Sequence, residues 1–227
     1  MSGPLRLVLF DVDGTLVDSQ GDIVMSMTAA FEGVGAPVPD RASILSIVGL
    51  SLPRAMAELA PRVEDAVRAR MVELYKGSYM ALRAAAGSAA SSPLYPGARA
   101  VLDGLSDASG TLLGVATGKS RRGLDALIAG HGLEGLFVTQ QTADHHPSKP
   151  HPAMIEEAMR ETGVEPHQTV MIGDTEFDME MARAAGVHAL GVSWGYHARE
   201  RLRQADRILD SMDALPDAID EIWRIAG

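Results

Sequence analysis

Two aspartates near the start of the chain could share a cation or a proton. Asp11 and Asp13 lie in the sequence DVDGT, directly after a short apolar run at residues 5–10. Side chains two residues apart at the end of a strand point to the same side, so both carboxylates face the same space. Two like charges about 4 Å apart repel by about 4 kcal/mol at an effective dielectric near 20. Such a pair favours a bound cation or a shared proton, and a simple turn at the end of a strand remains the alternative.

Three later segments carry polar groups of complementary chemistry. Thr117 and Gly118 offer a hydroxyl and a free amide before a predicted helix, which suits either a small anion site or an ordinary helix cap. Lys149 stands among prolines that stiffen the backbone, so its ammonium could hold a phosphoryl group or could simply be solvated. Asp174 and Asp178, in GDTEFD, follow another apolar run, and a structural role at the start of a helix is their alternative reading.

Short apolar runs alternate with helical patterns along most of the chain. This alternation predicts an α/β fold, with a Rossmann-like, doubly wound parallel sheet that helices cover on both faces. Ligands of such sheets bind at the carboxyl ends of the strands. The predicted strands are residues 5–10, 111–117, 136–139, 169–172, 189–193 and, more weakly, 207–209. The predicted helices between and after them are residues 97–108, 120–129, 152–162, 177–185 and 212–225.

One stretch, residues 19–86, contains helical patterns and no convincing strand. Its predicted helical segments are residues 21–32, 42–48, 52–59 and 63–86. The small, polar, Pro-ended sequence of residues 87–93 suits an exposed hinge. We therefore predict two domains, an α/β core formed by residues 1–17 and 93–227 and an inserted helical domain formed by residues 18–92.

The composition excludes several classes of function. The formal net charge of −10 argues against binding to nucleic acid or to an anionic membrane, because both require a basic face. The chain has no cysteine, which excludes disulfides, thiolate catalysis and Cys-ligated zinc. The N-terminal apolar run is too short for a signal peptide, and no run approaches the roughly 18 residues that span a bilayer. We expect a cytoplasmic protein.

Taken in order, the four segments resemble the haloacid dehalogenase-like hydrolase superfamily. DVDGT is similar to its first motif, Thr117-Gly118 to its second, Lys149 to its third and GDTEFD to its fourth. The helical insertion occupies the position of that family's small α-helical cap. Within the superfamily the chain looks most like the phosphoglycolate phosphatase group, because of the segments LFDVDGTLVDS, LYPGA and GVSWGYH.

The resemblance implies a phosphatase that acts on a small phosphorylated metabolite. Asp11 would attack phosphorus and form an aspartyl-phosphate, and Asp13 would protonate the leaving alcohol and then activate water. Thr117, Gly118 and Lys149 would bind the phosphate oxygens as charge spreads over them in the transition state.

The resemblance also implies magnesium as the cofactor. The Asp11 carboxylate, the Asp13 backbone carbonyl and Asp174 would hold the ion, and Asp178 would support it from behind. Four carboxylates around a phosphate dianion repel it, and a single lysine cannot offset that repulsion, whereas a divalent cation can.

Other residues are weaker candidates. Arg54, in the loop region between predicted cap helices, could meet an anionic group of the substrate, although a solvated arginine on a helix is the simpler reading. Lys119 is a similar candidate and is more simply a surface residue at the start of a helix. The tract that contains His145, His146 and His151 lacks helical spacing and cysteine partners, so it is interpreted as a surface loop.

Two alternative functions stay open. A phosphomutase would use the same two aspartates and return phosphate to a sugar, and a catalytically silent binding module could keep the fold without the chemistry. Phosphoglycolate, pyrophosphate, sugar phosphates and nucleoside monophosphates all stay open as substrates. The oligomeric state is equally open between a monomer and a homodimer.

Overall fold

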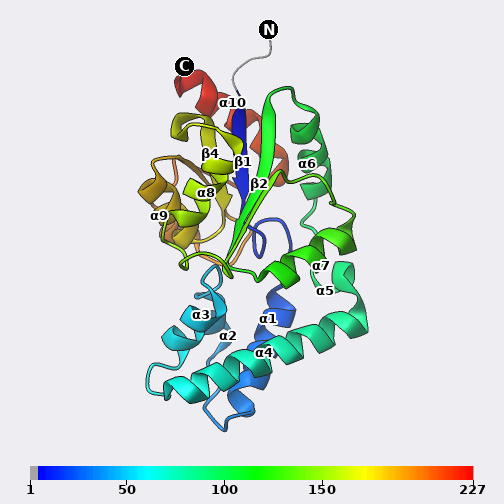
Figure 1. Cartoon of the computed structure of the whole chain (residues 1–227), viewed down its shortest axis with the longest axis vertical. Helices are drawn as coiled ribbons and strands as arrows, with labels where there is room; N and C mark the ends of the chain where they lie inside the picture. Colours follow the sequence, from blue (N-terminus) through cyan, green and yellow to red (C-terminus); the bar gives the residue numbers. More distant parts are fainter. Residues whose placement is uncertain (1–4, 227) are drawn as a thin grey trace.

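The computed structural model describes residues 5–226, and its centre is a six-stranded parallel sheet (Figure 1). The strand order is β3-β2-β1-β4-β5-β6, so β1 lies in the middle. The strands are β1 (Arg6–Phe10), β2 (Thr111–Thr117), β3 (Thr139–Thr142), β4 (Thr169–Gly173), β5 (His188–Val192) and β6 (Arg207–Leu209). The predicted α/β class with a doubly wound parallel sheet is confirmed.

Helices cover both faces of this sheet, and the alternation of side chains along β1 shows why. Val8 and Phe10 point into one core, and Leu7 and Leu9 point into the other. The first core is closed by α6 (Ala98–Asp107), α7 (Arg121–His131) and α10 (Leu215–Ala226). The second is closed by α8 (Ala153–Thr162) and α9 (Glu176–Ala185). Three short 3-10 helices complete the core: η1 (Pro166–Gln168), η2 (Arg199–Arg201) and η3 (Met212–Ala214).

The prediction for the third strand was wrong by three residues. β3 begins at Thr139, whereas the apolar residues Leu136 and Phe137 pack against the core before the strand starts. β3 is an edge strand and its side chains are polar. Thr139 Oγ1 and Gln141 Nε2 both donate to Glu161 Oε2 of α8, at 2.6 and 2.8 Å. A prediction based on runs of apolar residues therefore placed the strand at the residues that pack just before it.

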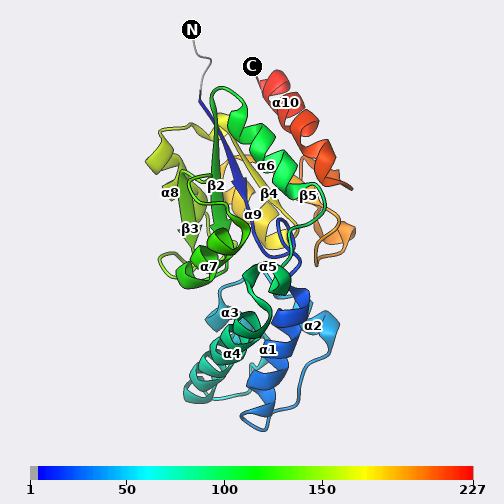
Figure 2. The ribbon, with the colours of Figure 1, turned by 90° about the vertical axis from the view of Figure 1, so that its right-hand side faces the viewer.

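The inserted helices form a separate layer beyond the carboxyl ends of the strands (Figures 1 and 2). Ile23, Met27, Phe31, Met56 and Met71 are buried in a core that belongs to this layer. The helices are α1 (Gln20–Glu32), α2 (Arg41–Leu45), α3 (Leu52–Leu59), α4 (Asp65–Ala86) and α5 (Ser88–Ser91). This separate core supports the division into two domains, whose boundaries stay a prediction.

The two connections between the layers run side by side. The Asp18 amide donates to the Pro93 carbonyl at 2.9 Å, and Val17 and Leu94 form an antiparallel bridge. The segment predicted to be an exposed hinge includes the short helix α5, and the carbonyl of Ser92 contacts His131 Nε2 at 2.8 Å. The end of this segment is therefore bonded to the core. None of the helices within residues 5–226 has the length and hydrophobicity that crossing a bilayer requires.

His197 joins the two layers through both of its ring nitrogens. Nδ1 accepts from the Glu176 amide at 3.2 Å, and Nε2 lies 3.0 Å from the Ser46 carbonyl of the inserted layer. This arrangement requires a neutral ring with the proton on Nε2. Burial, assisted by the charge of Arg201, lowers the pKa of His197 to about 4.

The neutral His197 ring predicts a specific loss of stability in acid. The unfolded chain binds a proton on this histidine below about pH 6.5, whereas the folded chain resists until about pH 4. Stability should therefore fall by up to about 3 kcal/mol across this window because of His197 alone. Urea unfolding of His197→Gln should show a flatter pH dependence than the wild type. The exposed His151→Gln should keep the wild-type slope, and equal slopes for all three proteins would contradict the assignment.

Candidate active site

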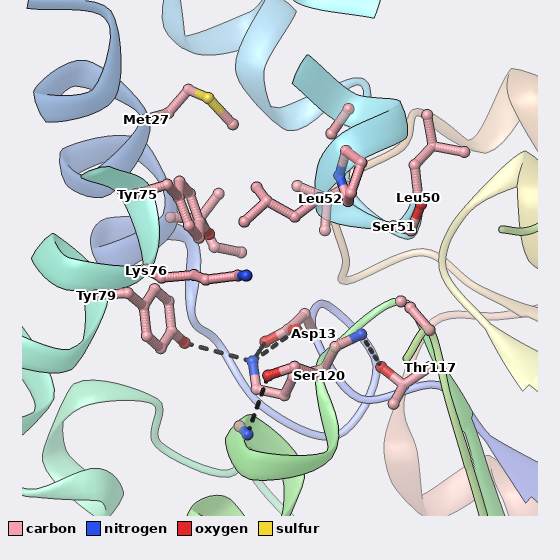
Figure 3. Close-up of a pocket in the computed structure, with 18 of the residues that line it drawn as sticks. Asp13, Met27, Leu50, Ser51, Leu52, Tyr75, Lys76, Tyr79, Thr117 and Ser120 are labelled. Carbon is pink, nitrogen blue, oxygen red and sulfur yellow. Dashed lines mark hydrogen bonds and ion pairs between the residues drawn. The ribbon is translucent and has the colours of Figure 1, made fainter. Parts of the chain in front are cut away.

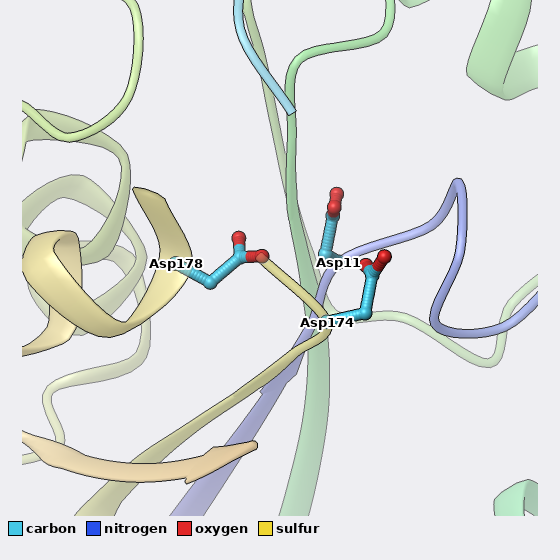
Figure 4. Close-up of side chains that lie close together, drawn as sticks. All are labelled: Asp11, Asp174 and Asp178. Atoms are coloured by element: carbon cyan, nitrogen blue, oxygen red, sulfur yellow. The ribbon is translucent and has the colours of Figure 1, made fainter. Parts of the chain in front are cut away.

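The parallel sheet brings the predicted residues together at one edge. Asp11 follows β1, Thr117 ends β2 and Asp174 follows β4, so all three lie at the carboxyl ends of neighbouring strands. Lys149 precedes α8, and Asp178 lies in the first turn of α9. One carboxylate oxygen from each of Asp11, Asp174 and Asp178 lies within 4.8 Å of the others (Figure 4). The site is therefore assembled by the sheet topology.

Lys149 is the cation at the centre of this cluster. Its Nζ lies 3.0 Å from Asp11 Oδ1 and 2.6 Å from Asp178 Oδ1, and its side chain is 0% exposed. Burial alone would lower the pKa of this lysine, but the neighbouring charges of Asp11 and Asp178 raise it above its usual value. Lys149 is therefore held as an ammonium ion, which is the form that can attract phosphate.

Asp178 is fully engaged with protein donors. Its Oδ2 accepts from the Thr175 amide at 3.0 Å and from Thr175 Oγ1 at 2.6 Å, within a capping box at the start of α9. Its Oδ1 accepts from Lys149. These bonds fix the carboxylate and the ammonium together, which fits the supporting role expected for Asp178.

Asp11 is the opposite case, because its carboxylate is buried without a hydrogen-bond donor aligned to either oxygen. The residue is 1% exposed, and the Lys149 ammonium is near but is not directed as a hydrogen bond. Burial raises the pKa of Asp11 to about 6; attraction by Lys149 opposes the rise, and repulsion by Asp178 adds to it. Both Asp11 oxygens therefore keep lone pairs that a cation or an electrophile could use.

Asp174 is held by two donors and enclosed by glycines. Oδ1 accepts from Thr15 Oγ1 at 3.0 Å, and Oδ2 accepts from the Tyr196 amide at 2.8 Å. A methyl group on Gly14 or Gly195 would lie 2.2 Å from the Asp174 side chain. Burial and the charges of the neighbouring aspartates raise the pKa of Asp174 well above its usual range.

These observations fit a divalent metal ion. The donor set is composed of hard carboxylate oxygens, which magnesium and calcium prefer. The group contains three carboxylates, and the Lys149 ammonium contacts only Asp11 and Asp178, so the mutual repulsion of the carboxylates is only partly compensated within residues 5–226. Asp11 and Asp174 keep lone pairs that no protein donor occupies, whereas the oxygens of Asp178 are already bonded.

Asp13 lies beside this cluster and has different partners. Both of its oxygens accept from Lys119 Nζ at 2.8 Å, and Oδ1 also accepts from Ser19 Oγ at 2.6 Å. The Lys119 ammonium also lies 3.4 Å from the hydroxyl of Tyr79 in α4 (Figure 3). Lys119 is thus a buried partner of Asp13, and its interpretation as a surface residue was wrong.

Sequence reasoning also missed Ser19 and the backbone of Tyr196. The backbone amide of Tyr196 donates a hydrogen bond to Asp174. Its side-chain hydroxyl lies 2.9 Å from the Ser19 amide and 3.1 Å from Ser19 Oγ. The segment GVSWGYH was noted for its resemblance, but nothing local in it indicates a contact with residues near position 19.

Thr117 and Gly118 line the same cavity as Asp11, and their role in phosphate binding stays a prediction. Thr117 Oγ1 accepts from the Lys119 amide at 3.2 Å. A methyl group on Gly118 would lie 2.5 Å from the carbonyl oxygen of Gly49 and 2.7 Å from that of Leu50. Glycine is therefore required here, because the inserted layer rests directly on this loop.

The structure does not bring Arg54 into this cavity. Its side chain is 60% exposed and pairs with Glu58 at 2.6 Å on the same helix. The three histidines of the tract are not among the metal-site candidates: His146 Nε2 contacts Gln141 Oε1 at 2.8 Å, and His145 and His151 are exposed. Within residues 5–226, the group of side chains that could hold a metal contains aspartates and no histidine.

Comparison with known proteins identifies the family. Residues 8–192 match the sequence profile described as haloacid dehalogenase-like hydrolase. The chain belongs to this family.

Similar proteins and solved structures support this family assignment. The probable phosphatase IndB of Dickeya dadantii is 37% identical in an alignment that covers 97% of this chain and 96% of that protein. A phosphoglycolate phosphatase of Vibrio vulnificus is 28% identical over 95% of this chain and 96% of its own length. The structure of a predicted phosphatase from Clostridium acetobutylicum is 27% identical, with a TM-score of 0.84 over 96% of this chain and 100% of that one. The resemblance to phosphoglycolate phosphatases is confirmed, and these relatives support the assignment of the chain as a phosphatase.

The enclosure of Asp174 leads to a test of the metal site. In Gly195→Ala the added methyl group would displace the Asp174 carboxylate. Loss of such a supporting contact typically weakens metal binding about 10–100-fold. Calorimetric titration with Mg²⁺ should show this loss. Gly104→Ala, whose added methyl group meets open space, should bind as the wild type does. Equal affinities for both variants would remove Asp174 from the metal site.

Proposed function

We propose that the chain is a magnesium-dependent phosphatase that hydrolyses a small phosphomonoester through an aspartyl-phosphate on Asp11. The observation that carries this proposal is the buried Asp11 carboxylate, which has no aligned donor, lies 3.0 Å from the Lys149 ammonium and faces the cavity. A nucleophile needs a free lone pair, and a phosphate needs a fixed positive charge beside it.

In the proposed reaction, an Asp11 oxygen forms a bond to phosphorus as the bond between phosphorus and the alcohol oxygen breaks. Asp13 donates a proton to the departing alcohol and then accepts one from the water that hydrolyses the acyl phosphate. The cycle releases alcohol and inorganic phosphate and returns both aspartates to their starting states. Lys149, the Thr117 hydroxyl and the Gly118 amide hold the phosphoryl oxygens during both steps.

Magnesium would be held by Asp11, Asp174 and the backbone carbonyl of Asp13, with Asp178 fixing Lys149 behind them. When bound, the ion supplies the positive charge that offsets repulsion between the carboxylates and the phosphate. Asp11 and Asp174 retain the unoccupied lone pairs that this role requires.

The names of the relatives make phosphoglycolate the first substrate to test. A phosphomutase remains the second candidate, because a β-phosphoglucomutase from Clostridium difficile shares the fold with a TM-score of 0.83 at 19% identity. The two functions differ in their product: the phosphatase releases free phosphate, whereas the mutase converts a sugar phosphate without releasing it.

Removal of the metal or of the nucleophile should abolish phosphate release. The wild type should hydrolyse phosphoglycolate or a generic aryl phosphate with Mg²⁺ and stop in excess EDTA. Asp11→Asn should be inactive in both conditions, because an amide oxygen does not attack phosphorus effectively. Asp107→Asn, on the exposed end of α6, serves as the matched control and should keep full activity. Full turnover in EDTA would refute the assignment.

Replacement of the proposed acid-base residue should slow turnover without removing the nucleophile. General acid-base catalysis contributes about 10²–10⁴-fold, so Asp13→Asn should lose activity in this range. The loss should be smaller for esters with acidic leaving groups, such as p-nitrophenyl phosphate, which depart without a proton. A similar rate constant for Asp13→Asn and wild type on alkyl phosphates would exclude Asp13 from the mechanism.

A further inference from the structure

The cavity in front of Asp11 has two chemically different ends (Figure 3). Its volume is about 770 Å³. The core supplies a polar floor that includes Asp11, Asp13, Thr117 and Gly118. The inserted layer supplies an apolar patch, which we call the roof and which consists of the side chains of Met27, Leu50, Leu52, Tyr75 and Tyr79. The charged residues Glu73, Lys76 and Arg83 of α4 line the cavity beside this roof. A phosphoryl group bound at the floor leaves the alcohol part of the ester facing this roof.

The roof is held close to the floor by direct contacts. The Gly49 and Leu50 carbonyls pack against Gly118 so closely that a methyl group would not fit. The Ser51 amide donates to Ser148 Oγ at 2.8 Å, which joins the roof to the loop that carries Lys149. Leu52 follows directly in α3. The apolar side chains therefore have a fixed position relative to the phosphate site.

Most cations that line the cavity already have partners. Lys119 pairs with Asp13, Lys76 pairs with Glu73 at 2.8 Å, and Arg83 donates to the Gly123 carbonyl at 3.4 Å. Arg122 is exposed at the core side of the cavity. A carboxylate on the substrate would have to displace one of these partners or reach Arg122. An apolar group would instead cover surface that otherwise stays in contact with water.

Size favours the same conclusion. Cavities of about 300–1,000 Å³ hold ligands of drug size, whereas a two-carbon acid occupies only a small part of such a volume. Phosphoglycolate bound at the floor would leave the roof unfilled. Tyr75 and Tyr79 stack with their ring centroids 5.9 Å apart, so the roof offers flat aromatic surface as well as the aliphatic Leu52.

We propose that the preferred substrate is a phosphomonoester whose alcohol carries an uncharged ring, and that Leu52 and the neighbouring roof side chains select it. This inference rests on the proposed phosphatase function and names the substrate class of the same site. Selection occurs by burial of the ring against the roof, whereas the chemistry at phosphorus is unchanged.

The test compares three esters under the same conditions with Mg²⁺: benzyl phosphate, methyl phosphate and phosphoglycolate. Benzyl alcohol and methanol have nearly equal acidity, so a difference in rate between their esters reports binding of the ring. One buried methylene changes kcat/KM by about 10-fold or more, so benzyl phosphate should exceed methyl phosphate by at least about 100-fold. It should also exceed phosphoglycolate.

Variants locate the effect on the roof. Leu52→Ala should lower kcat/KM for benzyl phosphate by about 10-fold or more and change that for methyl phosphate by less than about 2-fold. The matched control is Leu59→Ala. Leu59 lies on the same helix and packs against the same core of the inserted layer, but it does not line the cavity. It should leave the ratio of the two rates unchanged, as should Lys76→Met and Arg122→Met.

Three outcomes would overturn the inference, and they are distinguishable. If phosphoglycolate is preferred and Lys76→Met or Arg122→Met removes that preference, then the site selects charge and the phosphatase function stands. If the wild type releases no phosphate from any of the three esters or from p-nitrophenyl phosphate, then the proposed function itself fails. A ratio between benzyl and methyl phosphate that Leu52→Ala leaves unchanged would also exclude the roof as the selective surface.

Discussion

The site depends on one buried ammonium ion. Lys149 is the cation in contact with Asp11 and Asp178, and its side chain has no access to solvent. Removal of one partner from a buried ion pair is strongly destabilising, because the other charge is left without compensation. The loop before α8 and the first turn of α9 therefore hold each other in place through this lysine. Its position also fixes where a phosphate can be attracted.

A single ammonium does not neutralise the carboxylates that surround it. Burial and mutual repulsion raise the pKa values of Asp11 and Asp174, whereas the donors from Thr175 and Lys149 keep Asp178 satisfied. The folded chain thus retains electrostatic repulsion at the two carboxylates that have free lone pairs. A bound divalent cation relieves that repulsion, so metal binding and stability of the fold are linked. Repulsion between these carboxylates lowers the stability of the folded chain, and such a loss of stability in exchange for activity is common at active sites.

The sheet and the main site residues could be predicted because their signals are local. β1, β2, β4 and β5 are apolar runs. Most motif residues lie at the end of β1, β2 or β4 or in the first turn of the following helix, and Lys149 lies in the loop between β3 and α8. β3 escaped this criterion, because an edge strand can be polar when a helix such as α8 satisfies its side chains. The contacts between Tyr196 and Ser19, which are 177 residues apart in the chain, exist only after folding. Lys119 was misread for the same reason, since its partner Asp13 is 106 residues away.

The motif residues belong to the core and the roof belongs to the inserted layer. This separation explains why the motifs identify the type of reaction and not the substrate. Every motif residue that we propose to act at phosphorus belongs to the core and lies at or after the end of a strand or before a helix there, so sheet geometry fixes its position. The roof belongs to the inserted helices, where an apolar residue that lines the cavity, such as Leu52, has the same helical spacing as one that only packs, such as Leu59. Only the fold separates the two kinds, because it decides which side chain lines the cavity above the floor. Substitutions in the roof can therefore change the alcohol that is accepted while the bonds around Lys149 stay as they are.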